Sequence, residues 1–290
     1  MNRGYLTIAA RRSKFLEMAV DMALSLREYT EYPIGLAADK FIADLAKTKY
    51  RSVFDHITLL PLRFCKGRAL KYGAAEASPF EETIFVDADC IVLGPLDGLF
   101  AALDTNDLAM VGERLTFGDD TRHHGFSTSA LIRRFRLESY LKTNSGLFCF
   151  RRSKAMEILE DCLECYLKEV RPQLKYSTLL GRWLGDEIAF GIVGGRKEVG
   201  TLRKPDPMYW PPEFDTLNLN APEKPLLHMI WPPKKEVFEE LMSATTSRRC
   251  EAAVSGNAEL HWREEVRSMR RKIWRGTVLG RLMGGGGPKA

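Results

Sequence analysis

Short apolar runs alternate along the chain with stretches in which apolar residues recur at helical spacing. In the first such stretch, Phe15, Met18, Ala19, Met22 and Leu26 share one face of a helix. The expected strands are Tyr5–Ala10, Ile34–Ala38, Ile57–Leu60, Thr83–Val86, Leu108–Gly112, Ser145–Phe150 and Leu226–Ile230. The expected helices are Phe15–Tyr29, Asp39–Lys47, Arg68–Ala77, Lys154–Val170 and one that begins at Asp186–Phe190. This order predicts an α/β fold with a mostly parallel central sheet flanked by helices on both faces.

Two segments follow neither period. Residues 114–137 are expected to form a surface excursion on the acceptor side, and residues 205–233, which hold eight prolines, an extended connection. His123 and His124 are adjacent in the first segment. They lack further ligands at a spacing that would suit a metal, so a mobile loop is the better interpretation.

Composition excludes several classes of protein. Hydrophobic residues make up 45% and charged residues 28% of the chain, as in an ordinary globular protein. No apolar run approaches the roughly 20 residues that span a bilayer. Cys162 and Cys165 form a C-x-x-C pair in the middle of an expected helix, without a second pair or a histidine nearby. Free thiols and a cytoplasmic location are therefore expected.

The net charge of +5 is concentrated at the C-terminus. Residues 260–290 hold eight basic and two acidic residues, so the rest of the chain carries about −1. Trp262, Val266, Met269 and Ile273 follow helical spacing, with arginines between them. We expect a catalytic domain over 1–240 and a basic helical tail with a flexible end over 241–290. The tail is suited to peripheral contact with an anionic membrane surface, to packing on the body or to oligomerisation. The near-neutral body argues against nucleic acid binding.

A pair of carboxylates is the strongest chemical signal. Asp87 and Asp89 directly follow the strand Thr83–Val86. In open parallel sheets, ligands bind outside the carboxyl ends of the strands. The D-x-D spacing lets both carboxylates approach one cation, and oxygen ligands of this kind suit Mn²⁺ or Mg²⁺, which also bind substrate phosphates.

The segment around this pair resembles a known family. Lys71, Pro79-Phe80, Phe85-Val86-Asp87-Ala88-Asp89-Cys90 and Leu96-Asp97-Gly98-Leu99-Phe100 are similar to the core of glycosyltransferase family 8, which includes glycogenin and bacterial lipopolysaccharide glycosyltransferases. The resemblance covers roughly residues 4–235. It implies a GT-A fold, a UDP-sugar donor, Mn²⁺ and retention of anomeric configuration.

Several residues take their expected roles from this resemblance. Ala9 ends the first strand, which cradles the nucleoside, and Lys71 matches a basic residue that faces the nucleotide and donor. Asn144, Ser145 and Gly146 match an Asn-Ser-Gly motif in which the Asn amide binds donor hydroxyls and the Gly admits close approach.

The remaining expected roles lie further along the chain. Asp186 would orient the donor sugar, and Glu187 stands where the family has a glutamine near the anomeric carbon. The resemblance also implies that His228 is a third metal ligand and that Lys234 contacts the diphosphate. Whether Glu187 or Asp186 forms a covalent intermediate, or transfer occurs at the front face, is left open.

The expected function is therefore transfer of a sugar from a nucleotide-diphosphate donor to a hydroxyl of an unknown glycan, lipid or protein. A haloacid-dehalogenase-type phosphatase also uses an aspartate pair after a strand. In that class, however, the strand is usually the first of the domain, and Ile91 stands where a Thr or Val is common. A nucleotidyltransferase would need a glycine-rich loop after the first strand, which is absent from residues 9–14. A catalytically inactive nucleotide-sugar-binding protein stays open.

Overall fold

The centre of the fold is a large, mostly parallel sheet. A computed structural model describes residues 2–65, 69–174, 185–202, 206–210, 213–214, 216–229 and 235–253. Within these residues, seven strands form a sheet of order β10-β6-β9-β4-β1-β2-β3. The strands are β1 (Arg3–Ala9), β2 (Ile34–Ala38), β3 (His56–Leu59), β4 (Glu82–Val86), β6 (Leu108–Thr116), β9 (Ser139–Arg151) and β10 (Gly200–Thr201). Only β9 runs antiparallel to its neighbours in this sheet. The predicted parallel sheet is confirmed.

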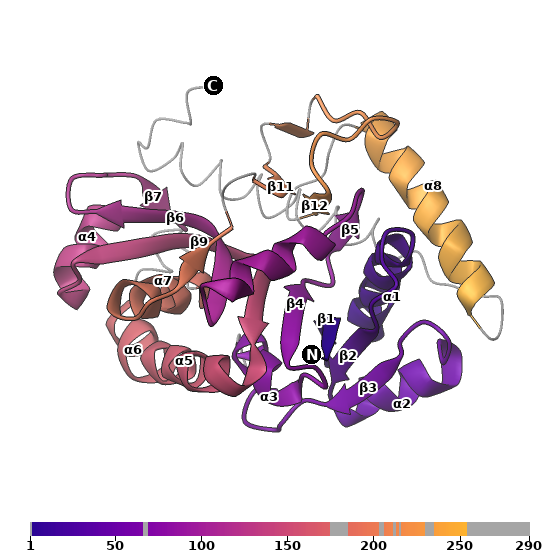
Figure 1. Cartoon of the computed structure of the whole chain (residues 1–290), viewed down its shortest axis with the longest axis horizontal. Coiled ribbons are helices and arrows are strands. Elements are labelled where there is room, and N and C mark those ends of the chain that lie inside the picture. Colours follow the sequence, from indigo (N-terminus) through magenta and orange to yellow (C-terminus); the bar gives the residue numbers. More distant parts are fainter. Residues whose placement is uncertain are drawn as a thin grey trace, which may run out of the picture.

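Helices cover both faces of this sheet (Figure 1). Successive residues of β1 face opposite sides: Tyr5 and Ala9 belong to one apolar core, and Leu6 and Ile8 to the other. The first core includes α1 (Ser13–Arg27) and α2 (Lys40–Lys49), and the second includes α3 (Ala74–Ala77), α5 (Arg152–Cys165) and α7 (Asp186–Arg196). The shorter helical elements are η1 (Leu70–Gly73), η2 (Asp97–Asp104), the π-helical η3 (Tyr166–Val170) and α6 (Arg171–Leu174). Helices on both faces were expected from the alternating pattern.

A small second sheet stands beside the end of β4. Its strands are β11 (Met208–Tyr209), β12 (Leu226–His228) and β5 (Cys90–Val92), in that order. β5 begins one residue after Asp89, and its partner β12 runs antiparallel to it, which sets His228 opposite Cys90. The chain thus brings residue 228 back to the aspartate pair.

Residues 114–137 are more regular than the sequence predicts. β6 continues to Thr116, paired with β9 back to Ser139. A hairpin of β7 (Arg122–His123) and β8 (Phe126–Ser127) follows, and then α4 (Thr128–Phe135). Ser127 caps α4, because its side chain accepts a hydrogen bond from the backbone N–H of Ala130. The expectation of an irregular excursion was therefore wrong. The pairing that orders this segment comes from β9, so local periodicity could not reveal it.

Two other boundaries differ from prediction. β9 begins at Ser139, six residues before the expected start at Ser145. The helix expected up to Ala77 is a 3-10 turn (η1) followed by a single α-helical turn (α3). In the expected connection of 205–233, the described residues include only the short strands β11 and β12.

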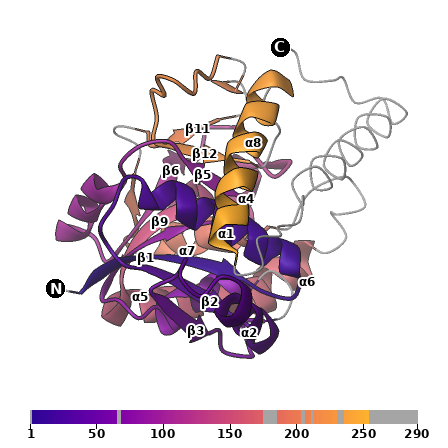
Figure 2. The same cartoon turned by 90° about the vertical axis from the view of Figure 1, so that its right-hand side faces the viewer.

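A last described helix, α8 (Lys235–Ala252), packs against α1 and crosses it (Figures 1 and 2). Leu241, Met242 and Thr245 are buried on the side of this contact, and the guanidinium of Arg249 is fully buried beside Asp21 of α1, with Nη1 and Oδ2 2.9 Å apart. The expected domain boundary after residue 240 falls inside α8. The expected basic helix around residues 262–273 lies outside the described residues. Among the described helices, none is long and apolar enough to cross a membrane.

Candidate active site

The aspartate pair lies at the carboxyl end of β4, between the two sheets. The backbone N–H of Asp87 donates to the carbonyl oxygen of Gly146 on β9 (2.8 Å), and the carbonyl oxygen of Asp89 accepts from the N–H of Met229 (2.9 Å). These backbone bonds attach the D-x-D segment both to the central sheet and to the end of β12. The side chains of Asp87, Asp89 and His228 are consequently brought together.

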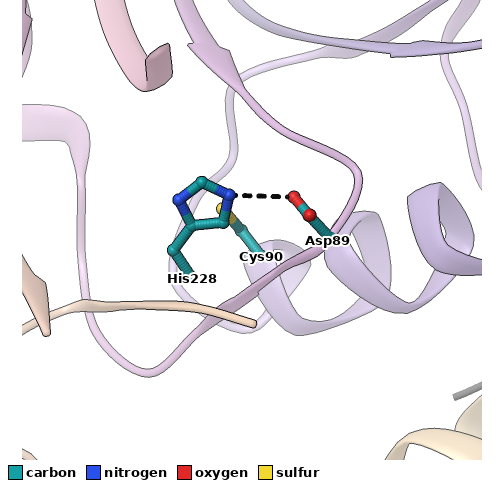
Figure 3. A group of neighbouring side chains, drawn as sticks. All are labelled: Asp89, Cys90 and His228. Atoms are coloured by element: carbon teal, nitrogen blue, oxygen red, sulfur yellow. Dashed lines mark ion pairs between the residues drawn. The ribbon is translucent and has the colours of Figure 1, made fainter. Parts of the chain in front are cut away.

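One nitrogen of His228 faces both carboxylates (Figure 3 shows its contact with Asp89). Nε2 lies 3.1 Å from Oδ1 of Asp89 and 3.9 Å from Oδ2 of Asp87. Metal–ligand bonds of about 2.1 Å place neighbouring ligands roughly 3 Å apart. The separation of His228 from Asp89 therefore suits two side chains that share one ion, and Asp87 lies farther from the same nitrogen.

The tautomer of His228 is fixed by Asn144. The backbone N–H of Gly146 donates to Oδ1 of Asn144 (2.7 Å), so that atom is an acceptor. Nδ1 of His228, 3.1 Å from the same oxygen, must therefore carry the proton that it donates. In the neutral imidazole, Nε2 then presents its lone pair to the two aspartates, as a metal ligand requires.

Gly146 makes room for this arrangement. A Cβ at this position would lie 2.5 Å from Nδ1 and 2.6 Å from Cε1 of His228. The motif predicts that another group approaches this glycine closely. In the structure that group is the ring of His228, the candidate metal ligand.

The charges of Asp87, Asp89 and His228 favour the binding of a divalent cation. Oδ1 of Asp89 is buried and has no hydrogen bond among the described residues, and Nε2 of His228 lies 3.1 Å from it. Burial raises the pKa of Asp87 and the charge of Asp89 adds to this, against the lowering effect of Lys71. Burial lowers the pKa of His228, but Asp89 and Asp87 outweigh burial and raise it. A cation would satisfy the orphaned oxygen and relieve the repulsion between the two carboxylates.

Cys90 also lies beside His228 and Asp89, but it is a poor ligand. Burial and the charges of Asp89 and Asp87 raise the pKa of its thiol well above the usual value. Its Sγ–H donates to the carbonyl oxygen of Gly146 at 3.8 Å. Without a metal the thiol therefore stays protonated, and the carboxylate of Asp87 is the type of ligand that Mn²⁺ and Mg²⁺ prefer over a thiolate.

Lys71 connects this site to a second pair of acids. Its Nζ lies 2.6 Å from Oδ2 of Asp87 and 3.7 Å from Oδ2 of Asp186, and it donates to Oγ of Ser145 at 2.9 Å. Burial lowers the pKa of Lys71, but the neighbouring carboxylates outweigh burial and raise it. A fixed positive charge therefore stands between the two groups of acids.

Asp186 and Glu187 occupy the first turn of α7 and are held by β9. Oγ of Ser145 donates to Oδ2 of Asp186 at 2.9 Å, and the backbone N–H of Ser145 donates to Oε1 of Glu187 at 2.9 Å. Tyr72 anchors the start of the helix by donating to the carbonyl oxygen of Asp186 at 2.9 Å. The structure thus brings together Lys71, Asp87, Ser145 and Asp186 of the predicted set.

The hairpin histidines have a partner that the sequence analysis did not find. Nε2 of His124 contacts Oε2 of Glu187, and Nε2 of His123 lies 3.4 Å from the same atom. The view that these histidines lack partners was therefore wrong, whereas the mobility expected of this loop stays a prediction. Glu187 is 63 residues further along the chain, so spacing gave no signal. The positive φ of His124 (50°) is visible only in the structure.

The last two predicted residues are Ala9 and Lys234. Ala9 is buried at the end of β1, in register with Ala38 of β2 and on the same edge of the sheet as Asp87. Lys234 lies outside the described residues. Their expected roles stay predictions.

Comparison with solved structures identifies the fold. The chain is similar to the galactosyltransferase LgtC in complex with donor and acceptor sugar analogs, with a TM-score of 0.56 and 13% identity over 90% of this chain and 99% of that chain. The fold is of the GT-A type. A glutamine-to-glutamate active-site mutant of LgtC matches with a TM-score of 0.56 and 14% identity over the same shares of the two chains.

A further similar structure is the glycosyltransferase GlyE of Streptococcus pneumoniae TIGR4, with a TM-score of 0.50 and 14% identity. That match covers 82% of this chain and 60% of GlyE. Comparisons with models of protein families and with curated protein sequences find no match. At these identities the comparisons establish the fold alone.

Proposed function

We propose that this protein is a metal-dependent glycosyltransferase that moves a sugar from a nucleotide-diphosphate donor, a UDP-sugar, to an acceptor hydroxyl with retention. The observation that carries the proposal is the convergence of Asp87, Asp89 and Nε2 of His228, with Oδ1 of Asp89 left without a hydrogen bond among the described residues. The GT-A fold supports it, because the neighbours with this fold are glycosyltransferases.

Asp87, Asp89 and His228 would hold Mn²⁺ or Mg²⁺. Such an ion, when bound, neutralises charge that develops on a diphosphate leaving group. Lys71 adds a second positive charge on the same side, since it already lies against Asp87. Lys234 is proposed to contact the diphosphate as well, and Ala9 to line the nucleoside end.

The acids of α7 would act on the sugar. Asp186 is proposed to accept hydrogen bonds from donor hydroxyls, with Asn144 supplying an amide donor. Ser145 fixes both acids of α7 by its side chain and backbone. Glu187 would face the anomeric carbon, where positive charge develops as the bond to the phosphate breaks. The acceptor is proposed to be a glycan, lipid or protein hydroxyl.

A donor-hydrolysis screen tests this function. Purified protein is incubated with UDP-, GDP- and CMP-sugars, with Mn²⁺ or with a chelator, and free nucleotide is measured. We expect release from a UDP-sugar only with the metal, and loss of release in Asp89→Asn but not in Asp104→Asn, an exposed carboxylate on η2. The anomeric configuration of the product, read by NMR, tests retention.

Other outcomes separate the alternatives. Metal-dependent binding of a donor without turnover would identify an inactive nucleotide-sugar-binding protein. Release of phosphate from a phosphate monoester would favour the phosphatase. Absence of both binding and turnover for every donor contradicts the proposal.

A further inference from the structure

Glu187 is enclosed by hydrogen-bond donors from two other elements. The backbone N–H and Oγ of Ser145 on β9 approach Oε1 at 2.9 and 3.3 Å, and Nε2 of His124 in the β7–β8 turn contacts Oε2. The carboxylate is largely buried, with 12% of its side chain exposed. Both oxygens are thus held, which fixes the plane of the carboxylate relative to α7.

His124 reaches this position through an unfavourable backbone conformation. His123 pairs with Phe126, so His124 and Gly125 form a two-residue hairpin turn, and their φ angles are 50° and 84°. Positive φ at both positions defines a type I′ turn, which favours Asn-Gly or Gly-Gly. A residue other than glycine in the left-handed region costs about 1 kcal/mol. A strained residue that also contacts a buried carboxylate points to a functional role.

The neighbouring His123 cannot take the place of His124. Its Nε2 lies 3.0 Å from the carbonyl oxygen of Thr143, an obligate acceptor, and its Nδ1 lies 2.7 Å from the hydroxyl of Tyr140. Nε2 therefore carries the proton, and Nδ1 accepts from the tyrosine. Burial lowers the pKa of His123, against the raising effect of Glu187, which favours the neutral ring.

This tautomer also argues against a metal at the histidine pair. The lone pair of His123 points at Tyr140 and away from Glu187, so only His124 and Glu187 are left as ligands. The cluster is better described as a hydrogen-bonded group around Glu187 than as a second metal centre.

We propose that His124 is a positioning residue, which keeps Glu187 ionised and in one orientation beside Asp186 at the sugar-binding end of the site. Without His124, a buried carboxylate would take up a proton or turn toward water. A fixed anion stabilises positive charge on a reacting sugar without reorganisation. The role in transfer rests on the function proposed above, whereas the hold on the carboxylate does not.

Turnover tests the catalytic half of this inference. The variants are His124→Asn, Glu187→Gln and the double variant, since asparagine suits the first position of a type I′ turn. We expect His124→Asn to lower kcat by about tenfold or more, with the donor KM nearly unchanged. In the Glu187→Gln background the same change should have little effect, because a neutral amide has no ionised state for His124 to maintain. Equal losses in both backgrounds would show a merely structural role and overturn the proposal.

Carboxyl ¹³C NMR tests the other half without any donor. Several charged or titratable groups face Glu187. They are His123 and His124 of the hairpin, Tyr140 of β9, Lys71 of η1, and Asp186, which directly precedes Glu187. The pKa of Glu187 lies well below its usual range, because the two histidines outweigh burial. The Glu187 signal, assigned by its loss in Glu187→Gln, should titrate at higher pH in His124→Asn. An unchanged titration overturns the inference, even if the protein proves to transfer no sugar.

Discussion

Nδ1 of His228 donates to Oδ1 of Asn144, whose acceptor role is set by the backbone N–H of Gly146. A backbone group on β9 thereby determines which nitrogen of a histidine on β12 faces the aspartates. His228 is only 3% exposed. Its imidazole is therefore oriented before any ligand binds. Outer hydrogen bonds of this kind contribute to the affinity of a metal site as its ligands do.

Asn144→Ala is expected to weaken Mn²⁺ binding about tenfold to a hundredfold, because it removes the acceptor that orients His228. Isothermal titration calorimetry measures the affinity directly. Asn220→Ala is the control, since Asn220 is exposed. Unchanged affinity in Asn144→Ala would mean that the imidazole is held in place by other contacts.

Gly146→Ala is expected to leave the backbone intact and to displace His228. The new Cβ would lie 2.5 Å from Nδ1 of His228 and 2.9 Å from Oδ1 of Asn144, which is too close for either to stay in place. Mn²⁺ affinity should fall while the fold, followed by circular dichroism, persists. Gly98→Ala is the matched control, because a Cβ there meets nothing within 4 Å. Equal affinity in both variants would contradict the described packing.

The strands of the central sheet could be predicted because they are buried on both faces. Ile34–Ala38 and Thr83–Val86 read as continuous apolar or β-branched runs, and the structure places strands there. The extra length of β6 and β9 could not be read in this way. Their outer halves mix exposed and buried residues, and only their mutual pairing orders them.

Part of the candidate site could also be predicted from the sequence, because it lies next to one of these strands. Asp87 and Asp89 directly follow a strand, and the family resemblance supplied His228, Asn144 and Asp186. The link between His124 and Glu187 was not accessible. It depends on a type I′ turn and on the approach of α7 to that turn, which no local pattern encodes.

Arg249→Met is expected to destabilise the protein by about 3–5 kcal/mol, because it leaves the carboxylate of Asp21 buried without its guanidinium partner. Urea unfolding measures the loss. The neighbouring Arg248→Met is the control. Its partner Glu28 is 45% exposed, and a surface pair of this kind contributes at most about 1 kcal/mol. A similar small loss in both variants would show that Arg249 does not anchor α8.

Glu82→Gln is expected to lower stability by about 2 kcal/mol at neutral pH, because the hydrogen bonds from Arg3 and Arg151 would lose their charged acceptor. Burial raises the pKa of Glu82, but the two arginines outweigh burial and lower it. A depressed pKa contributes stability that is complete above the unfolded value of about 4.3 and is lost as pH falls through the folded value.

The difference between wild type and Glu82→Gln should therefore shrink when urea unfolding is repeated below about pH 4. Glu31→Gln, at an exposed position, serves as the control. A difference that stays constant down to pH 3 would exclude ionisation of Glu82 as its cause.

The contact between α8 and α1 also constrains the order in which the protein can be completed during synthesis. Asp21 leaves the ribosome long before its partner Arg249, which lies 228 positions later. Domains generally fold as units as the chain emerges, but α1 cannot obtain this ion pair until nearly the whole described chain has been made. A nascent chain that stalls before α8 would expose the face of α1 that Leu241 and Met242 cover in the finished protein. Such a chain is the form most in need of a chaperone.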